Sequence, residues 1–172
     1  MTSPWLRANK VRFHKTGPAL IGGDTMTTHI STHFTWREAT HSDTAVRRGL
    51  RNDPDDAVKQ AIEDAAHGLE GVRSLLGDKP IDITSWYRSP EVNAAVGGSK
   101  TSDHITGYAA DFRPRAMNAY QAAKMIEASP LMFDQLIWYP AQDRLHMSFA
   151  PKLRREVMTK RQSATYAKGL DA

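Results

Sequence analysis

The sequence contains no cysteine. Disulfide bonds and thiolate metal ligands are therefore excluded, and any bound metal must be held by histidine and carboxylate side chains. The sequence also has no apolar run close to the ~20 residues of a membrane-spanning helix. The apolar stretch at 18–23, which follows four basic residues, is too short for the core of a signal peptide. We therefore expect synthesis in the cytoplasm without an export signal.

Nothing else in the composition is unusual for a globular protein. Hydrophobic residues make up 40% of the 172 residues and charged residues 24%. A chain of this length fits one domain and can bury roughly 70% of its unfolded surface. We expect a single domain that folds without disulfide bonds.

The positive charge is concentrated at the two ends of the chain. Residues 1–25 contain 4 Lys and Arg against 1 acidic residue, and residues 151–172 contain 6 against 2. The segment between them contains 13 against 16. Basic ends suit anionic envelope polymers or nucleic acid, although an ordinary solvated tail has the same composition. Since the middle is acidic and carries no nucleic-acid-binding motif, we expect no specific nucleic-acid partner.

Three segments are predicted along the chain. Residues 1–25 contain proline and glycine without an apolar period, which indicates a poorly structured basic leader. Codons for the Gly-Gly-Asp sequence before Met26 can spell a purine-rich ribosome-binding site, so the native start is either Met1 or Met26. Residues 26–161 are predicted to form the folded domain, and residues 162–172 a basic C-terminal tail.

The elements of the folded domain alternate between helical and extended patterns. Thr35 and Glu38 form a capping-box pattern, and Asp53 with Pro54 is typical of a helix start, with apolar residues at helical spacing up to Leu76. Further helices are predicted at 89–96 and 118–128, and strands at 81–86, 108–112, 133–139 and 144–149, the last two as a hairpin. The order predicts an α+β fold with a small, mostly antiparallel sheet flanked by helices.

A possible metal site is formed by His104, Asp111 and His146. Zinc accepts an imidazole nitrogen and a carboxylate oxygen, and a catalytic zinc keeps one position open. A turn at Gly107 can bring Asp111 back beside His104, and His146 lies on a predicted strand that also carries Arg144. By spacing alone, however, a histidine near an aspartate is more typical of a structural pair.

Two further residues have candidate catalytic roles. Asp143 lies three residues before His146, so in a regular strand it faces the other side, and it reaches the metal only from the turn before the strand. From there its carboxylate could act as a general base. Arg88 could stabilise an oxyanion or bind a substrate carboxylate through paired donors.

The pattern Ser102-x-His104-x-x-Gly107-x-Ala109-x-Asp111, followed by Asp143-x-x-His146, resembles the D-Ala-D-Ala carboxypeptidase family. That family shares a zinc superfamily with lysostaphin-type peptidases and the hedgehog signalling domain. The resemblance covers roughly residues 30–161. It implies zinc ligands at His104, Asp111 and His146, a catalytic base at Asp143, a transition-state or substrate anchor at Arg88, and a supporting role for Ser102.

The resemblance also implies a substrate, the stem peptides of peptidoglycan. Phage L-alanyl-D-glutamate endopeptidases of the family have aspartate at the position of Asp143, whereas zinc D-Ala-D-Ala carboxypeptidases have an extra histidine at the position of Arg144. We therefore expect a phage or prophage endolysin that acts on the wall from the periplasm or from the virion. The alternatives are a D-Ala-D-Ala carboxypeptidase and a non-catalytic phage structural protein that retains the fold.

Overall fold

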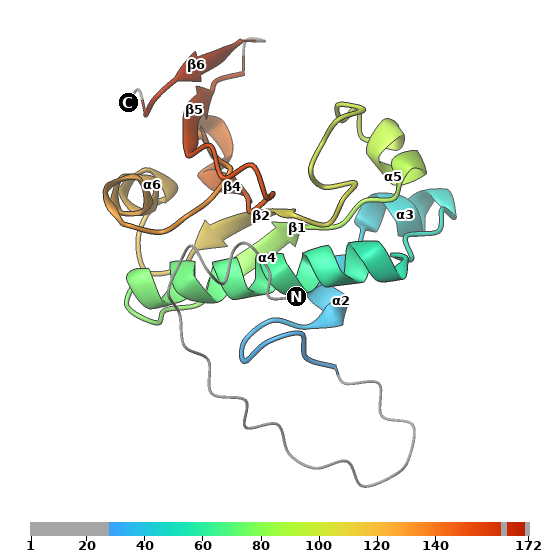
Figure 1. The fold of residues 1–172 in the computed structure, drawn as a ribbon. Coiled ribbons are helices and arrows are strands. Elements are labelled where there is room, and N and C mark those ends of the chain that lie inside the picture. The colour runs from blue at the N-terminus through green and yellow to red at the C-terminus, as the bar shows by residue number, and fades with distance from the viewer. Residues whose placement is uncertain (1–27, 163–164, 171–172) are drawn as a thin grey trace, which may run out of the picture.

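One six-stranded sheet forms the centre of the computed structural model, which describes residues 28–162 and 165–170 (Figure 1). The predicted leader and the question of Met26 therefore lie outside the described residues. The strands are β1 (Ile81–Ser85), β2 (Ala109–Pro114), β3 (Gln135–Tyr139), β4 (Arg144–Ser148), β5 (Glu156–Lys160) and β6 (Tyr166–Lys168). Their order in the sheet is β1-β2-β4-β3-β5-β6.

The pairing confirms the predicted α+β fold with a mostly antiparallel sheet. All neighbouring strands pair antiparallel except β3 and β5, which are parallel. The predicted hairpin is β3 and β4, joined by the short 3-10 helix η1 (Pro140–Gln142). As a result, β4 lies between β2 and β3 and is hydrogen-bonded along both edges.

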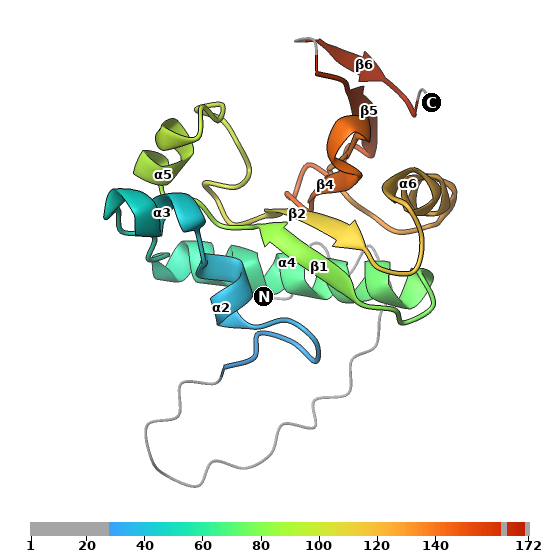
Figure 2. The same cartoon turned by 180° about the vertical axis from the view of Figure 1, so that it is seen from behind.

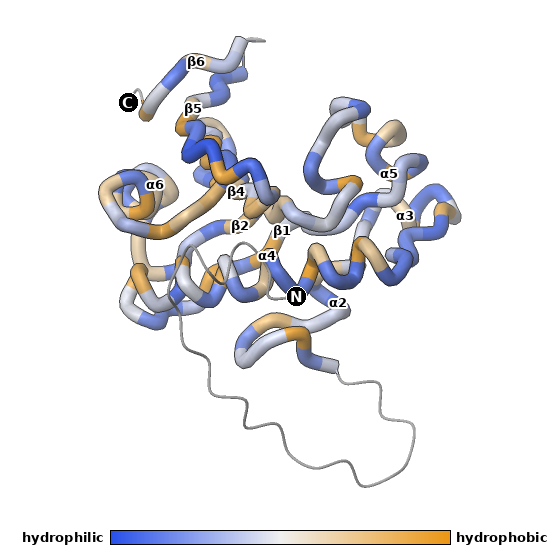
Figure 3. The backbone as a smooth tube through the Cα atoms, viewed as in Figure 1, coloured by the Kyte–Doolittle hydropathy of each residue, from blue (hydrophilic) through white to orange (hydrophobic). Residues whose placement is uncertain are grey.

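The longest helix, α4 (Asp56–Leu75), packs through an apolar face into the core beside the sheet. Figure 3 shows hydrophobic and hydrophilic residues alternating along it, as expected for a helix with one buried face. The predicted start was two residues early. Asp55, not Asp53, is the N-cap, because its side chain accepts a hydrogen bond from the backbone N–H of Val58.

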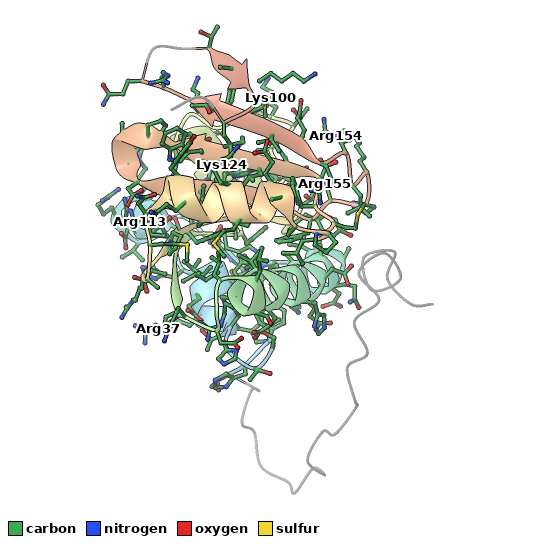
Figure 4. The ribbon with its side chains drawn as sticks, turned by 90° about the vertical axis from the view of Figure 1, so that its left-hand side faces the viewer. Arg37, Lys100, Arg113, Lys124, Arg154 and Arg155 are labelled. Carbon is green, nitrogen blue, oxygen red and sulfur yellow. The ribbon has the colours of Figure 1, made fainter. Side chains whose placement is uncertain are left out.

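Helix α6 (Ala119–Ala128) packs on the same core, against β2, β3 and β4. Asn118 caps its first turn, as the predicted boundary at 118 implies. At the other end, the Arg155 guanidinium donates hydrogen bonds to backbone carbonyls of Glu127 and Ser129 (Figure 4). This contact satisfies carbonyls that the last helical turn leaves without partners.

Three short helices lie toward the β1 edge of the fold: α2 (Trp36–Thr40), α3 (Asp43–Arg48) and α5 (Pro90–Ala95). Figure 2 shows α2 near β1, with β2 beside it. The predicted capping box of α2 is present in full, since the Thr35 hydroxyl accepts from the Glu38 N–H and the Glu38 carboxylate accepts from the Thr35 N–H. Helix α3 was not predicted.

One strand, β6, extends the sheet beyond the predicted domain boundary at residue 161. Strand β6 lies within the segment 162–172 that was predicted to be a tail, and it pairs antiparallel with β5. Tyr166 and Lys168 lie opposite Lys160 and Met158 in this pairing. Among the described helices, none combines the length and the apolar character needed to cross a membrane.

Candidate metal centre

Two of the three predicted ligands are placed by the pairing of β2 with β4. Asp111 and His146 lie directly opposite each other in the antiparallel register, so their side chains point to the same face of the sheet. Their strand neighbours Phe112 and Leu145 point the other way and are fully buried in the core. The His146 Nδ1 lies 2.9 Å from the Asp111 Oδ1.

The third predicted ligand, His104, is brought in by the loop between α5 and β2. Its Nδ1 lies 2.6 Å from the backbone carbonyl oxygen of Trp86. Because a carbonyl only accepts, Nδ1 carries the proton, and the lone pair of the neutral ring lies on Nε2. That Nε2 lies 3.4 Å from the Asp111 Oδ1, so the contact with Trp86 orients the ring toward the carboxylate.

The loop that carries His104 is held by contacts with the core. The Trp86 indole N–H donates to the carbonyl of Gly107, and Gly107 has a φ of +86°. A Cβ at this position would lie 2.9 Å from the backbone oxygen of Val58 on α4. Glycine is therefore required both by the backbone conformation and by the close approach of α4.

Together, His104, Asp111 and His146 form a buried cluster that fits a metal ion. Each offers one ligand atom, and these atoms lie within 4.8 Å of one another. Two imidazoles and one carboxylate are the ligands of a catalytic zinc that keeps an open position. The prediction of these three ligands from the sequence agrees with this geometry.

The protonation states of the cluster also suit a cation. Burial lowers the pKa of His104, although Asp111 opposes this shift, so its imidazole stays neutral near pH 7. Burial alone would raise the pKa of Asp111. At the low pH where a carboxylate takes up its proton, the positive charge of the imidazoles, of His104 above all, and their hydrogen bonds outweigh burial and hold that pKa well below its usual value. Asp111 therefore stays ionised, as a metal ligand must.

The predicted anchor Arg88 also reaches the cluster. Its Nη2 lies 3.3 Å from the Asp111 Oδ2, and its Nε donates to the hydroxyl of Ser85. No pattern in the sequence points to the residue that holds this turn, Asn52. The Asn52 side chain donates to the carbonyl of Tyr87 and accepts from the N–H of Ser89, so it binds the backbone on both sides of Arg88.

Ser102 lies near the first ligand, as the resemblance implies. Its hydroxyl oxygen is 3.4 Å from the backbone nitrogen of His104, and its carbonyl accepts from the N–H of Ile105. These contacts shape the tight turn that carries His104. The supporting role expected for this serine stays a prediction.

Asp143, in contrast, is not brought to the cluster. It adopts a left-handed conformation with a φ of +44° at the end of η1, and its Oδ1 accepts a hydrogen bond of 2.7 Å from the N–H of Ala119. Its carboxylate therefore binds the start of α6, while the residue itself is exposed. Strand alternation had indicated this direction, and the turn before β4 does not reverse it. The expected placement of Asp143 beside the metal is corrected.

The placement of Asp143 gives a sharp test. We expect Asp143→Asn to keep turnover within about tenfold of wild type, because an asparagine oxygen can still accept from Ala119, whereas loss of a general base costs roughly 10²–10⁴-fold. Asp143→Ala should lower the free energy of unfolding by about 1 kcal/mol through loss of the contact. Steady-state kinetics measures turnover, and chemical denaturation measures the free energy of unfolding. The control is Asn118→Ala, which removes another side-chain cap of α6. A 10²-fold loss in Asp143→Asn with unchanged stability would restore Asp143 as the base.

The residue after Asp143, Arg144, makes a contact with the cluster that Asp143 does not make. Arg144 faces the cluster, and its Nη1 donates a hydrogen bond of 2.7 Å to the Asp111 Oδ2. Its guanidinium also stacks on the Tyr139 ring, 4.4 Å from the centroid. The sequence placed Arg144 on the same strand face as His146, but gave no indication of its contact with Asp111.

The cluster lies in a cleft of about 990 Å³ above the sheet. In Figure 1 the elements on its two sides are α3, α5 and the following loop on the right, and β5 and β6 at the top. Residues from both sides line it, including Arg47, Ser99, Lys152, Glu156 and Tyr166. A cleft of this size and mostly polar lining suits a peptide rather than a small apolar ligand.

Comparison with known proteins agrees with this arrangement. A family model described as peptidase M15 matches residues 32–148, which include all three residues of the cluster and Arg88. A segment of 43 residues is 44% identical to the zinc D-Ala-D-Ala carboxypeptidase of Streptomyces albus G. This segment covers 25% of the chain and 17% of the length of that protein.

Proposed function

Because the chain belongs to the peptidase M15 family, we propose that it is a zinc peptidase that hydrolyses an amide bond in the stem peptides of peptidoglycan. One observation carries the proposal. The buried His104–Asp111–His146 cluster lies in an open cleft, inside the segment that the family model matches. The zinc carboxypeptidase that the chain resembles over 43 residues supports both the metal and the substrate class.

The residues around the cluster have distinct roles in such a reaction. When bound, zinc supplies Lewis-acid chemistry that polarises a carbonyl and makes water a stronger nucleophile near neutral pH. His104 is held in the correct tautomer by the Trp86 carbonyl. Arg88 and Arg144 place guanidinium donors beside the cluster, where negative charge on a substrate or on a developing oxyanion is stabilised.

For the finer assignment, we favour an endolysin of a phage or prophage that cleaves between L-Ala and D-Glu. Arg144 stands where the carboxypeptidase branch has an extra histidine, and this supports an endopeptidase. The aspartate at position 143 supported the same assignment, but its contact with Ala119 removes the catalytic reason for it. The alternative is a D-Ala-D-Ala carboxypeptidase, which the similarity to the Streptomyces albus G protein favours.

Digestion of defined muropeptides tests the function and separates the two bonds. Purified protein with zinc is incubated with disaccharide-tetrapeptide and, separately, with disaccharide-pentapeptide, and the products are identified by mass spectrometry. We expect release of the peptide distal to L-Ala from both substrates. Loss of one D-Ala from the pentapeptide alone would show a carboxypeptidase. No product from either substrate, with zinc bound, would support the non-catalytic structural protein instead.

The site of action is part of the same proposal. An endolysin is made in the host cytoplasm and acts on the wall in the periplasm or from the virion. The basic segments at the two ends suit anionic envelope polymers, which would hold such an enzyme near its substrate. Sedimentation with purified cell wall at increasing salt tests this attraction, because contacts between exposed charges weaken as ionic strength rises.

A further inference from the structure

The two oxygens of the Asp111 carboxylate face different groups. Oδ1 faces the imidazoles of His104 and His146, where a metal would bind. Oδ2 accepts from the guanidinium groups of Arg88 and Arg144, at 3.3 and 2.7 Å. The Asp111 side chain is 3% exposed, whereas those of Arg88 and Arg144 are 15% and 23% exposed. The two arginines therefore lie between the buried ligand and the open cleft.

The positive charges around the Asp111 carboxylate outnumber its single negative charge. Two guanidinium groups, which stay protonated in proteins, meet one carboxylate oxygen. A bound divalent metal would add two further positive charges. The place next to the metal therefore has a positive potential that favours an anionic group.

Most N–H donors of Arg144 have no hydrogen-bond acceptor among the described residues. A guanidinium has five N–H donors, and Arg144 makes one hydrogen bond to the described residues, through Nη1 to Asp111. Its Nε is buried and has no hydrogen-bond partner there. Stacking on the Tyr139 ring holds the planar group in place at little further cost in conformational entropy. Since the buried Nε does not reach the cleft, the donors left for a ligand are those of Nη2 and the second N–H of Nη1, and this pair of donors has the geometry that binds a carboxylate in a bidentate manner.

We propose that Arg144, together with Arg88, forms a clamp for a free α-carboxylate on the substrate residue that supplies the leaving amine. The inference rests on the proposed peptidase function. It adds a requirement on the substrate that holds for either of the two candidate bonds. In the L-Ala–D-Glu bond the leaving residue continues through its γ-carboxyl group, so its α-carboxylate is free. In a terminal D-Ala–D-Ala bond the leaving residue also has a free α-carboxylate. The clamp fits both bonds and disfavours a bond whose leaving residue has that carboxylate blocked as an amide.

Binding of two small probes tests the clamp without turnover. N-acetyl-D-alanine and N-acetyl-D-alaninamide differ in a single group, the carboxylate or carboxamide. Titration of the zinc-loaded protein, followed by NMR, should show the carboxylate probe binding about 10- to 100-fold more tightly. Arg144→Gln should lower the affinity for the carboxylate probe toward that of the amide. Arg144→Lys, which keeps the charge but not the fork, should retain part of the difference.

Controls separate the clamp from a purely structural role of Arg144. Arg115→Gln removes the same charge from an exposed residue that pairs with Asp82, and it should leave the difference between the probes unchanged. Zinc content and thermal melting of each variant show whether the site is intact. Equal affinity of wild type for both probes, or an unchanged difference in Arg144→Gln with only zinc affinity reduced, would overturn the clamp. Neither result affects the muropeptide digestion, so failure of the clamp and failure of the peptidase function are distinguishable.

Discussion

Replacing His146 with alanine should remove zinc from the protein and reduce hydrolysis of muropeptides to the level of buffer. The cluster offers three ligand atoms, so this change leaves His104 and Asp111 alone. Loss of an outer partner of a metal ligand costs about 10–100-fold in metal affinity, and loss of a ligand itself should cost more. Metal analysis after gel filtration, with one zinc per wild-type chain as the reference, measures the effect.

A matched histidine variant shows whether the loss is specific. His41 is exposed and pairs with Asp43, and it is not part of the cluster. His41→Ala should therefore keep its zinc, whereas His104→Ala and Asp111→Ala should lose it as His146→Ala does. Full zinc occupancy in His146→Ala would mean that the metal is held elsewhere, and the proposed centre would then be abandoned.

Gly107→Ala should strongly destabilise the metal loop, the segment between α5 and β2 that carries His104, and with it the fold. Alanine is strained at a φ of +86°, which costs about 1–3 kcal/mol. The added Cβ would also meet the backbone oxygen of Val58 at 2.9 Å and the Ile62 side chain at 2.9 Å. Since the backbone of α4 cannot move aside cheaply, we expect a total loss of about 3 kcal/mol or more and a reduced zinc affinity. Urea denaturation of the metal-free protein gives the first quantity.

Gly97→Ala provides the matched control for this prediction. Gly97 also has a positive φ, +72°, but nothing lies within 4 Å of its Cβ position. It should therefore show the strain alone, about 1–2 kcal/mol, with zinc affinity unchanged. If the two variants were equally stable, close packing of the metal loop against α4 would not be what holds His104 in place.

Much of the fold was predictable because its signals are local. The capping box at Thr35 and Glu38, the cap at Asn118 and the alternation along β4 each depend on a few neighbouring residues, and all are present. Helix α3 and strands β5 and β6 were not predicted, and of these only β6, with 3 residues, is shorter than the elements that were. Strand β5 is also held by a parallel pairing with β3, which nothing in its own sequence specifies.

The sequence by itself predicted which three residues could hold a metal, because the motif that contains His104, Asp111 and His146 resembles that of the D-Ala-D-Ala carboxypeptidase family. It also determined that Arg144 shares a strand face with His146, because strand side chains alternate. Only the tertiary structure decided that Arg144, and not its neighbour Asp143, contacts the cluster. The left-handed turn at Asp143 directs its carboxylate to α6, and the pairing of β1 with β2 brings Arg88 to the same carboxylate oxygen as Arg144. These contacts join residues 23 to 33 positions apart, so no local pattern encodes them.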